Sequence, residues 1–255
     1  MRGYVDTRWG QLHYSSTGSG EKTIALFHET PLDHWAFQRL VPELARSLRV
    51  VVFDTPGYGE SDPPPGITTI EEYSATFAAA IEALGIDRLA VLGVHTGADY
   101  AVELAANVIP GRIDGVVIIG LPFYDEDVRL ARVPAQVPAF REDGQHLIES
   151  FLRPPREYDS DLLSRMAGAV VEYPDRAFWA YHSVYRYLPG EALPKITAPV
   201  LFLSNEQDPL FHGDEMALKI VRDGRQVMVA SEKLPLYWTQ PSRVAAEVVS
   251  FLGVK

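Results

Sequence analysis

The sequence predicts an α/β domain built on a doubly wound, mostly parallel sheet, with a helical lid inserted between two of the strands. Three observations carry this prediction. Six short apolar runs are rich in β-branched residues, segments of helical period separate most of them, and one long stretch contains no such run. With 255 residues, the chain is long enough for one large domain with a substantial core.

The six apolar runs are the predicted strands of the sheet. They are short, continuous and without polar alternation, which is typical of strands covered on both faces. They lie at residues 23–28, 48–54, 89–93, 115–120, 199–204 and 226–230. Before them, Arg2–Thr7 and Gln11–Ser16 alternate polar and apolar residues around Trp9-Gly10, and this pattern predicts an N-terminal hairpin.

Segments of helical period connect these runs. We expect helices at about residues 34–47, 70–84, 97–108 and 241–252. Strand and helix therefore alternate with short connections, and this order favours parallel strands joined by right-handed crossovers.

From about Leu121 to Lys195 the alternation stops, and Pro-punctuated amphipathic segments follow instead, around residues 145–151, 161–171 and 177–187. We predict a core formed by residues 1–121 and 196–255 and a helical lid formed by residues 122–195. Open α/β sheets bind ligands at the carboxyl ends of their strands, and the lid is expected to cover that edge.

Charge and composition exclude several classes of binding partner and of site chemistry. The formal charge is −11, from 34 acidic and 23 basic residues, so nucleic acid and anionic membranes are not expected to bind. Cysteine is absent, which excludes disulfides, thiolate metal sites and a cysteine nucleophile. The N-terminus has no apolar signal-peptide region and no window is long and apolar enough to span a bilayer, so a cytoplasmic protein is expected. The predicted partner is a small-molecule substrate, and the oligomeric state is left open.

Five segments, in order, match motifs of a known family. They are LFHETP at 26–31, FDTPGYGESD at 53–62, GVHTG at 93–97, NEQDP at 205–209 and the Gln240-Pro241 start of the last helix. Together they resemble the α/β-hydrolase superfamily. In the family, the first four segments correspond in order to an oxyanion turn, a D-x-x-G-x-G-x-S loop, a G-x-S-x-G nucleophile elbow and a turn bearing the catalytic acid.

The resemblance places residue 95 at the tip of the elbow, with the small residues Gly93 and Gly97 on either side as this tight turn requires. The chain departs from the family pattern at three places. His95 replaces the serine, the slot of the catalytic histidine falls on about Leu234, and Glu29 stands where a glycine is expected in the oxyanion turn. A serine-esterase mechanism is therefore not expected.

The altered residues point to proton transfer instead. An imidazole titrates near neutrality, and we expect His95 to fill roughly the space of the missing base, within reach of Asp208 or Glu29. Asp208, in the acid slot, either pairs with His95 or is structural. Glu29 either points into solvent or points inward, as a second acid/base or as the partner of His95. The backbone N–H groups of Thr30 and Thr96 are the oxyanion donors that the resemblance implies.

Other residues are predicted to line the substrate pocket, although packing is the alternative for the aromatic ones. From the lid they are His146, Trp179, Tyr181, His182 and Tyr185, and from the core His28, Leu234, Tyr237 and Trp238. His28 is interpreted as a structural hydrogen-bonding residue, and His13, His34 and His212 as surface or packing residues. The histidines show no metal-ligand spacing and no phosphate-binding loop follows the first strands, so no metal and no cofactor is predicted.

The favoured hypothesis is an enzyme that acts on a small, largely apolar carbonyl compound by general acid–base chemistry at His95. Hydrolysis through an activated water and lyase, isomerase or cyclase chemistry remain open, because members of the superfamily include several reaction types. The alternatives are a non-catalytic small-molecule binding protein that uses the same pocket and, less favoured, a catalytically inactive structural subunit.

Overall fold

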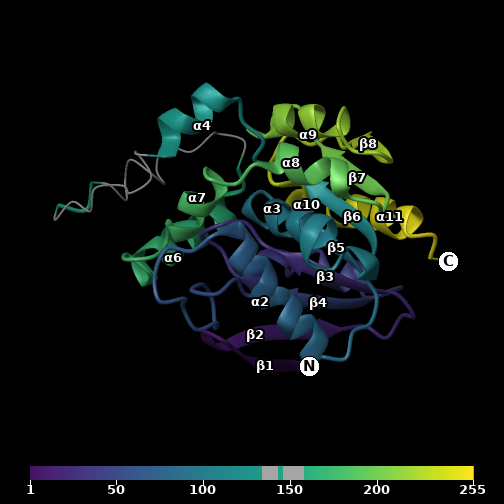
Figure 1. The fold of residues 1–255 in the computed structure, drawn as a ribbon, viewed down its shortest axis with the longest axis horizontal. Helices are drawn as coiled ribbons and strands as arrows, with labels where there is room; N and C mark the ends of the chain where they lie inside the picture. The colour runs from purple at the N-terminus through teal and green to yellow at the C-terminus, as the bar shows by residue number, and fades with distance from the viewer. Residues whose placement is uncertain (134–142, 146–157, 255) are drawn as a thin grey trace.

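The computed structural model describes residues 1–133, 143–145 and 158–254, and its core is one eight-stranded sheet (Figure 1). The strand order is β1-β2-β4-β3-β5-β6-β7-β8. The strands are β1 (Arg2–Thr7), β2 (Gly10–Thr17), β3 (Thr23–Phe27), β4 (Arg49–Phe53), β5 (Leu89–Val94), β6 (Ile113–Ile119), β7 (Val200–Ser204) and β8 (Gly224–Met228). The predicted hairpin and all six predicted strands are confirmed, with ends that differ by at most two residues.

Strand register brings the ends of the central strands to one edge. β1 and β2 pair antiparallel and β2 runs antiparallel to β4, whereas β4, β3, β5, β6, β7 and β8 run parallel to one another. Phe27 of β3 lies opposite Gly93 of β5, and Val94 lies opposite Ile119 of β6. The residues that follow these strands therefore start from the same level of the sheet.

Helices and helical turns fill the connections and cover both faces of the sheet. They are η1 (His34–Phe37), α1 (Val41–Leu44), α2 (Ile70–Ala83), α3 (Thr96–Glu103), η2 (Leu104–Val108), η3 (Pro110–Arg112), α4 (Glu126–Arg132), α6 (Ser160–Glu172), α7 (Trp179–Val184), α8 (Pro189–Ala192), η5 (Leu193–Lys195), α9 (Phe211–Leu218), α10 (Leu236–Thr239) and α11 (Pro241–Phe251). None of the described helices is long and apolar enough to cross a bilayer.

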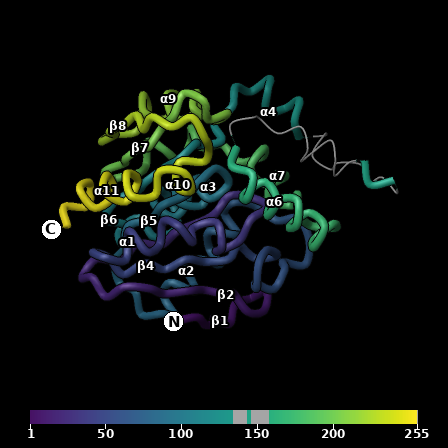
Figure 2. The backbone as a smooth tube through the Cα atoms, turned by 180° about the vertical axis from the view of Figure 1, so that it is seen from behind, coloured from purple at the N-terminus to yellow at the C-terminus, as the bar shows by residue number. Residues whose placement is uncertain are grey.

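Successive strand residues face two separate cores, as the two-residue period of a strand requires. Ala25 and Phe27 pack with α2 and α3, which lie in front of the sheet in Figure 1. Ile24 and Leu26 pack with α1 and α11, which Figure 2 shows from behind. The central strands β3, β5 and β7 are buried along their whole length, so a site can form only at their ends.

The predicted helix at 34–47 is wrong as a single element. It is broken into η1 and α1, with a turn between them. Pro42 has no N–H to donate to residue 38 and its ring would clash there, whereas proline is tolerated in the first turn of a new helix. The predicted helix at 97–108 is α3 continued by the π-helical turn η2.

The stretch predicted as a lid contains the helices α4, α6, α7 and α8. The segments expected at 161–171 and 177–187 correspond to α6 and α7. The segment expected at 145–151 lies outside the described residues, apart from Gln145. Helix α4 was not predicted, since none of its residues is buried and it has no apolar face to detect. Helix α9, between β7 and β8, was also not predicted.

Candidate active site

The turn from β5 into α3 carries His95 at the carboxyl edge of the sheet. Its backbone has φ 48° and ψ −115°, and it is the only non-glycine residue with positive φ in the described part of the chain. Crowding explains the flanking glycines. A Cβ on Gly93 would lie 2.1 Å from the carbonyl oxygen of Gly97, and one on Gly97 would lie 2.0 Å from that of Phe27. The turn is strained, and such strain is concentrated at functional sites.

The imidazole of His95 lies between two carboxylates. Its Nδ1 is 2.9 Å from Oε2 of Glu29, and its Nε2 is 3.1 Å from Oδ2 of Asp208. The structure thus brings together the three side chains that the sequence singled out. Glu29 points inward rather than into solvent, and both carboxylates contact the ring.

This geometry determines the charge of His95. Burial opposes protonation, but the negative charges of Asp208 and then Glu29 outweigh it, so the pKa of His95 is raised well above its usual value. Burial likewise opposes ionisation of Asp208, but the charge of His95 and its hydrogen bond lower the pKa of this carboxyl. At neutral pH the ring is therefore an imidazolium that donates to both carboxylates, and it holds a proton ready for transfer.

Two further residues hold Glu29 in place. The Tyr237 hydroxyl donates to Oε1 of Glu29 at 2.5 Å, and Glu29 is 2% exposed. The backbone N–H of Thr55 donates to Nε2 of His28, so Nδ1 of that ring carries the proton and donates to the carbonyl of Glu29 at 3.0 Å. His28 is thus a structural hydrogen-bonding residue and Tyr237 is a direct partner of the buried carboxylate.

Asp208 is held by its own turn. Its backbone N–H donates to the carbonyl of Asn205, and its Oδ1 accepts from the N–H of Leu210 at 2.8 Å. The amide of Asn205 in turn donates to the carbonyl of Val229 after β8. The carboxylate is therefore fixed before any substrate arrives, as preorganised catalysis requires.

Gly120 is a site residue that sequence reasoning missed. It follows β6 with φ 68°, and a Cβ there would lie 2.6 Å from Cδ2 of His95 and 3.0 Å from Oδ1 of Asp208. A larger residue would displace the imidazole or the carboxylate. The signal was present as the last residue of the predicted strand 115–120, since a glycine in a strand can mark close approach of another group.

A cavity of about 300 Å³ opens above His95. Its floor is formed by Glu29, Thr30, His95 and Thr96, and the described residues that complete its lining are Pro122, Tyr124, Arg132, Tyr158, Met166, Tyr181, Val184, Tyr185, Pro209 and Leu210. The hydroxyl of Tyr181 donates to the carbonyl of Thr30, which ties the α7 side of the cavity to the oxyanion turn.

The upper wall of the cavity is aromatic and carries one cation. The rings of Tyr124 and Tyr185 stack with centroids 5.3 Å apart, and the guanidinium of Arg132 lies 4.8 Å from the ring centre of Tyr124. Arg132 also donates to the Tyr185 hydroxyl at 3.0 Å. Sequence reasoning found Tyr185 but missed Arg132, the last residue of α4, and Tyr124, which precedes that helix, because this part of the chain has no helical signal.

Several predicted pocket residues do not line this cavity. They are His28, Trp179, His182, Leu234, Tyr237 and Trp238, and His146 lies outside the described residues. Trp238 faces the other layer, where its ring packs on Trp35 with centroids 4.8 Å apart. His182 is buried against Arg186, and Leu234 is fully buried behind Tyr158. An aromatic run at helical spacing turns only one side to the cavity, so Tyr181 and Tyr185 face it and Trp179 does not.

The charge pairs between His95 and the two carboxylates are expected to stabilise the fold only within a limited range of pH. Because the pKa of His95 is raised in the folded state, its charge adds to the unfolding free energy. This stabilisation is complete below about pH 6.5, declines as the pH rises above that value, and is lost above the folded pKa. Since the folded pKa of Asp208 is lowered, its contribution is present above about pH 3.8 and is lost as the pH falls through the folded value. We expect His95→Gln to cost about 3 kcal/mol of unfolding free energy between these limits.

Guanidinium unfolding of both proteins from pH 3 to pH 10 measures this difference. The comparison with the variant is needed because burial also raises the pKa of Asp214 to about 7, which makes the wild type less stable as the pH rises through that value. Asp214 is present in both proteins and cancels in the difference. A difference that is independent of pH would contradict the predicted pairing.

The fold and the strand-to-helix elbow define the class of protein. Residues 22–150 match the family model of the alpha/beta hydrolase fold, and the chain belongs to this family. The predicted family and fold class are confirmed.

Particular relatives are similar over part of the chain. A 2-hydroxy-6-oxononadienedioate/2-hydroxy-6-oxononatrienedioate hydrolase of Pseudomonas putida is 37% identical over 116 residues, which is 43% of this chain and 40% of the relative. The bifunctional epoxide hydrolase 2 of Mus musculus is 32% identical over 146 residues, or 54% of this chain and 26% of the relative. The matches thus span less than half of each relative.

A solved structure shows the same fold over the whole chain. The enol-lactonase of Burkholderia xenovorans superposes with a TM-score of 0.82 at 21% identity, covering 98% of this chain and 100% of the other. At this identity the similarity concerns the fold.

Proposed function

We propose that the protein is an enzyme that acts on a small, largely apolar carbonyl compound by general acid–base catalysis at Glu29, His95 and Asp208. The observation that carries this proposal is the imidazole of His95, held between two buried carboxylates at 2.9 and 3.1 Å on the floor of the cavity. Acid–base catalysis needs a proton donor and an acceptor side by side, and the Glu29–His95 hydrogen bond supplies both.

In this mechanism Glu29 accepts a proton and His95 holds one. For hydrolysis, the Glu29 carboxylate takes a proton from a water whose oxygen adds to the carbonyl carbon. The negative charge that develops on the carbonyl oxygen is stabilised by the N–H groups of Thr30 and Thr96 and by the imidazolium. The bond to the leaving group then breaks, and the leaving group takes a proton from the Glu29–His95 pair.

Proton abstraction from the carbon beside a carbonyl uses the same residues. Glu29 removes the proton and the same N–H groups hold the enolate oxygen. Return of a proton from His95 to another atom of the enolate completes an isomerisation. In a lyase reaction the enolate instead expels a leaving group, which takes that proton, and in a cyclisation the enolate carbon bonds to a second electrophilic carbon of the substrate, whose own oxygen or leaving group takes the proton. The proton held by Glu29 then passes to His95, which restores both groups. No side chain of the protein bonds covalently to the substrate in either version.

The cavity lining supports a mainly apolar substrate with one polar end. Tyr124, Tyr181 and Tyr185 offer flat apolar surface, and Arg132 adds a cation beside Tyr124 and Tyr185. The P. putida relative is named for an oxo-dioate, and the B. xenovorans neighbour is named as an enol-lactonase. Both names describe compounds with a carbonyl group, in line with the proposed substrate class.

A panel of esters, lactones and β-diketones tests the proposal on the wild-type protein. We expect turnover of at least one class that survives treatment with a fluorophosphonate, since no serine stands at the elbow, and an unchanged protein mass after that treatment. The pH–rate profile should fall at alkaline pH, where the imidazolium of His95 loses its proton.

Two outcomes contradict the proposal. Inactivation together with a covalent adduct on a serine would establish nucleophilic catalysis elsewhere. Absence of turnover across the panel, combined with thermal stabilisation by the same compounds, would establish a binding protein.

A further inference from the structure

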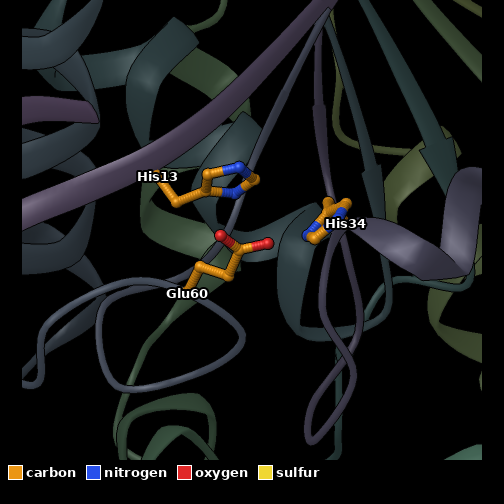
Figure 3. Close-up of side chains that lie close together, drawn as sticks. All are labelled: His13, His34 and Glu60. Carbon is orange, nitrogen blue, oxygen red and sulfur yellow. The ribbon is translucent and has the colours of Figure 1, made fainter. Parts of the chain in front are cut away.

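Two histidines and a glutamate lie close together away from the candidate active site. His13 lies on β2, His34 begins η1, and Glu60 lies in the loop after β4. One nitrogen of each imidazole and one carboxylate oxygen of Glu60 lie within 4.8 Å of one another. Figure 3 shows the carboxylate facing both rings. The ring centroids of the two histidines are 4.7 Å apart.

A buried carboxylate orients both rings in the same way. Oδ2 of Asp54 lies 2.8 Å from Nδ1 of His13 and 3.0 Å from Nδ1 of His34. Metal-binding histidines typically donate their second N–H to a carboxylate, which fixes the tautomer and makes the other nitrogen more basic. With Nδ1 of each ring turned to Asp54, Nε2 is the nitrogen that remains for a metal.

A second observation points to a missing ligand. Nε2 of His13 is buried and has no hydrogen-bond partner among the described residues, and the side chain is 1% exposed. Buried polar atoms are rarely left without a partner. The cluster is also open on one side, since the side chain of Glu60 is 44% exposed, so an ion can enter from solvent.

We propose that His13, His34 and Glu60 form a binding site for a divalent late first-row metal such as Zn²⁺, with Asp54 orienting both imidazoles from behind. Two imidazole nitrogens and one carboxylate oxygen are a donor set that suits Zn²⁺, Co²⁺ or Ni²⁺, and water completes a four-coordinate site. The two acidic residues, Asp54 and Glu60, offset the charge of the ion.

The donor atoms lie within 4.8 Å of one another and must move closer together to bind an ion. Nitrogen and oxygen ligands at about 2.0–2.2 Å from a tetrahedral Zn²⁺ are about 3.4 Å from one another. Glu60 has the most freedom to move, because its side chain is half-exposed. Its Oε2 accepts the O–H of Tyr4, and its Oε1 lies 3.9 Å from the guanidinium of Arg2. The sequence did not reveal the site because His13 and His34 have no metal-ligand spacing, and they meet only where β2 and η1 come together in the fold.

Zn²⁺ titration of the chelator-treated full chain by calorimetry tests the proposal. We expect one site per chain, and Glu60→Gln and His34→Asn should each weaken Zn²⁺ binding by about 10-fold or more, at least the effect of losing a second-shell partner. Thermal melts without metal check that both variants are folded, and Glu60→Gln is the safer variant because the side chain is half-exposed. Co²⁺ absorption gives an independent view of the coordination geometry.

Two control variants distinguish this site from others. His212→Ala removes an exposed histidine that stands 3.6 Å from Glu215, and His95→Ala removes the histidine of the candidate active site. Both are expected to leave Zn²⁺ affinity unchanged. The proposal is overturned if the wild type binds no Zn²⁺ below millimolar concentrations, or if binding survives Glu60→Gln and is lost in either control.

Discussion

Replacing His95 by alanine is expected to reduce turnover of any substrate found in the panel by about 10²- to 10⁴-fold, the usual contribution of a positioned acid–base group. The variant loses the proton donor and leaves two buried carboxylates, Glu29 and Asp208, without the cation between them. The measurement is kcat and kcat/KM at neutral pH, with a thermal melt to confirm folding.

His95→Ser is the informative companion variant. It places a hydroxyl at the elbow, but among the described residues that line the cavity His95 is the only histidine. Serine therefore has no base, and we expect it to be as inactive as alanine. Substantial activity in either variant would show that the imidazole is not part of the machinery.

Glu29→Gln is expected to distinguish the role of Glu29 from that of Asp208. It keeps the shape and the hydrogen bond to Tyr237 but removes the acceptor of the proton, so kcat should fall much more than KM changes. An unchanged kcat would assign the role of base to Asp208 instead.

Gly97→Ala is expected to destabilise the fold by about 3 kcal/mol or more, because overpacked backbone has no side chain that can move aside. The added Cβ would lie 2.0 Å from the carbonyl oxygen and 2.5 Å from the carbonyl carbon of Phe27. Either α3 is pushed from the sheet or the end of β3 shifts, and with it the turn that carries Glu29.

Chemical denaturation measures the effect, and Gly111→Ala is the matched control. A Cβ at Gly111 meets nothing within 4 Å, so the control should change the unfolding free energy by no more than about 0.5 kcal/mol. Equal stability of the two variants would mean that the elbow is not as tightly packed as described.

The sheet could be predicted from the sequence because a strand that is buried on both faces has a continuous apolar run of residues. Runs such as 23–27 and 89–94 are continuous and β-branched because each residue meets one of the two cores. Helices were predicted less well where the sequence has no apolar face of helical period or where a proline interrupts it. Helix α4 has no buried residue, and the helix expected at 34–47 is interrupted at Pro42.

The three central site residues could also be named from the sequence, because each sits in a motif that stands at the end of a strand. The sequence left open whether Glu29 points inward and which carboxylate reaches His95. Those answers depend on the parallel register of β3, β5 and β6, on Gly120 and on Tyr237, which lies 208 residues from Glu29.

By itself, the sequence determined the layered α/β fold, the family motifs and the imidazole at the elbow, since apolar periodicity and turn residues act over a few positions. Only the tertiary structure decided the charge of that imidazole, the residues lining the cavity and the meeting of His13 with His34. Charge and ligation depend on atoms a few ångströms apart in space, and the chain contributes them from strands and loops that no local pattern connects.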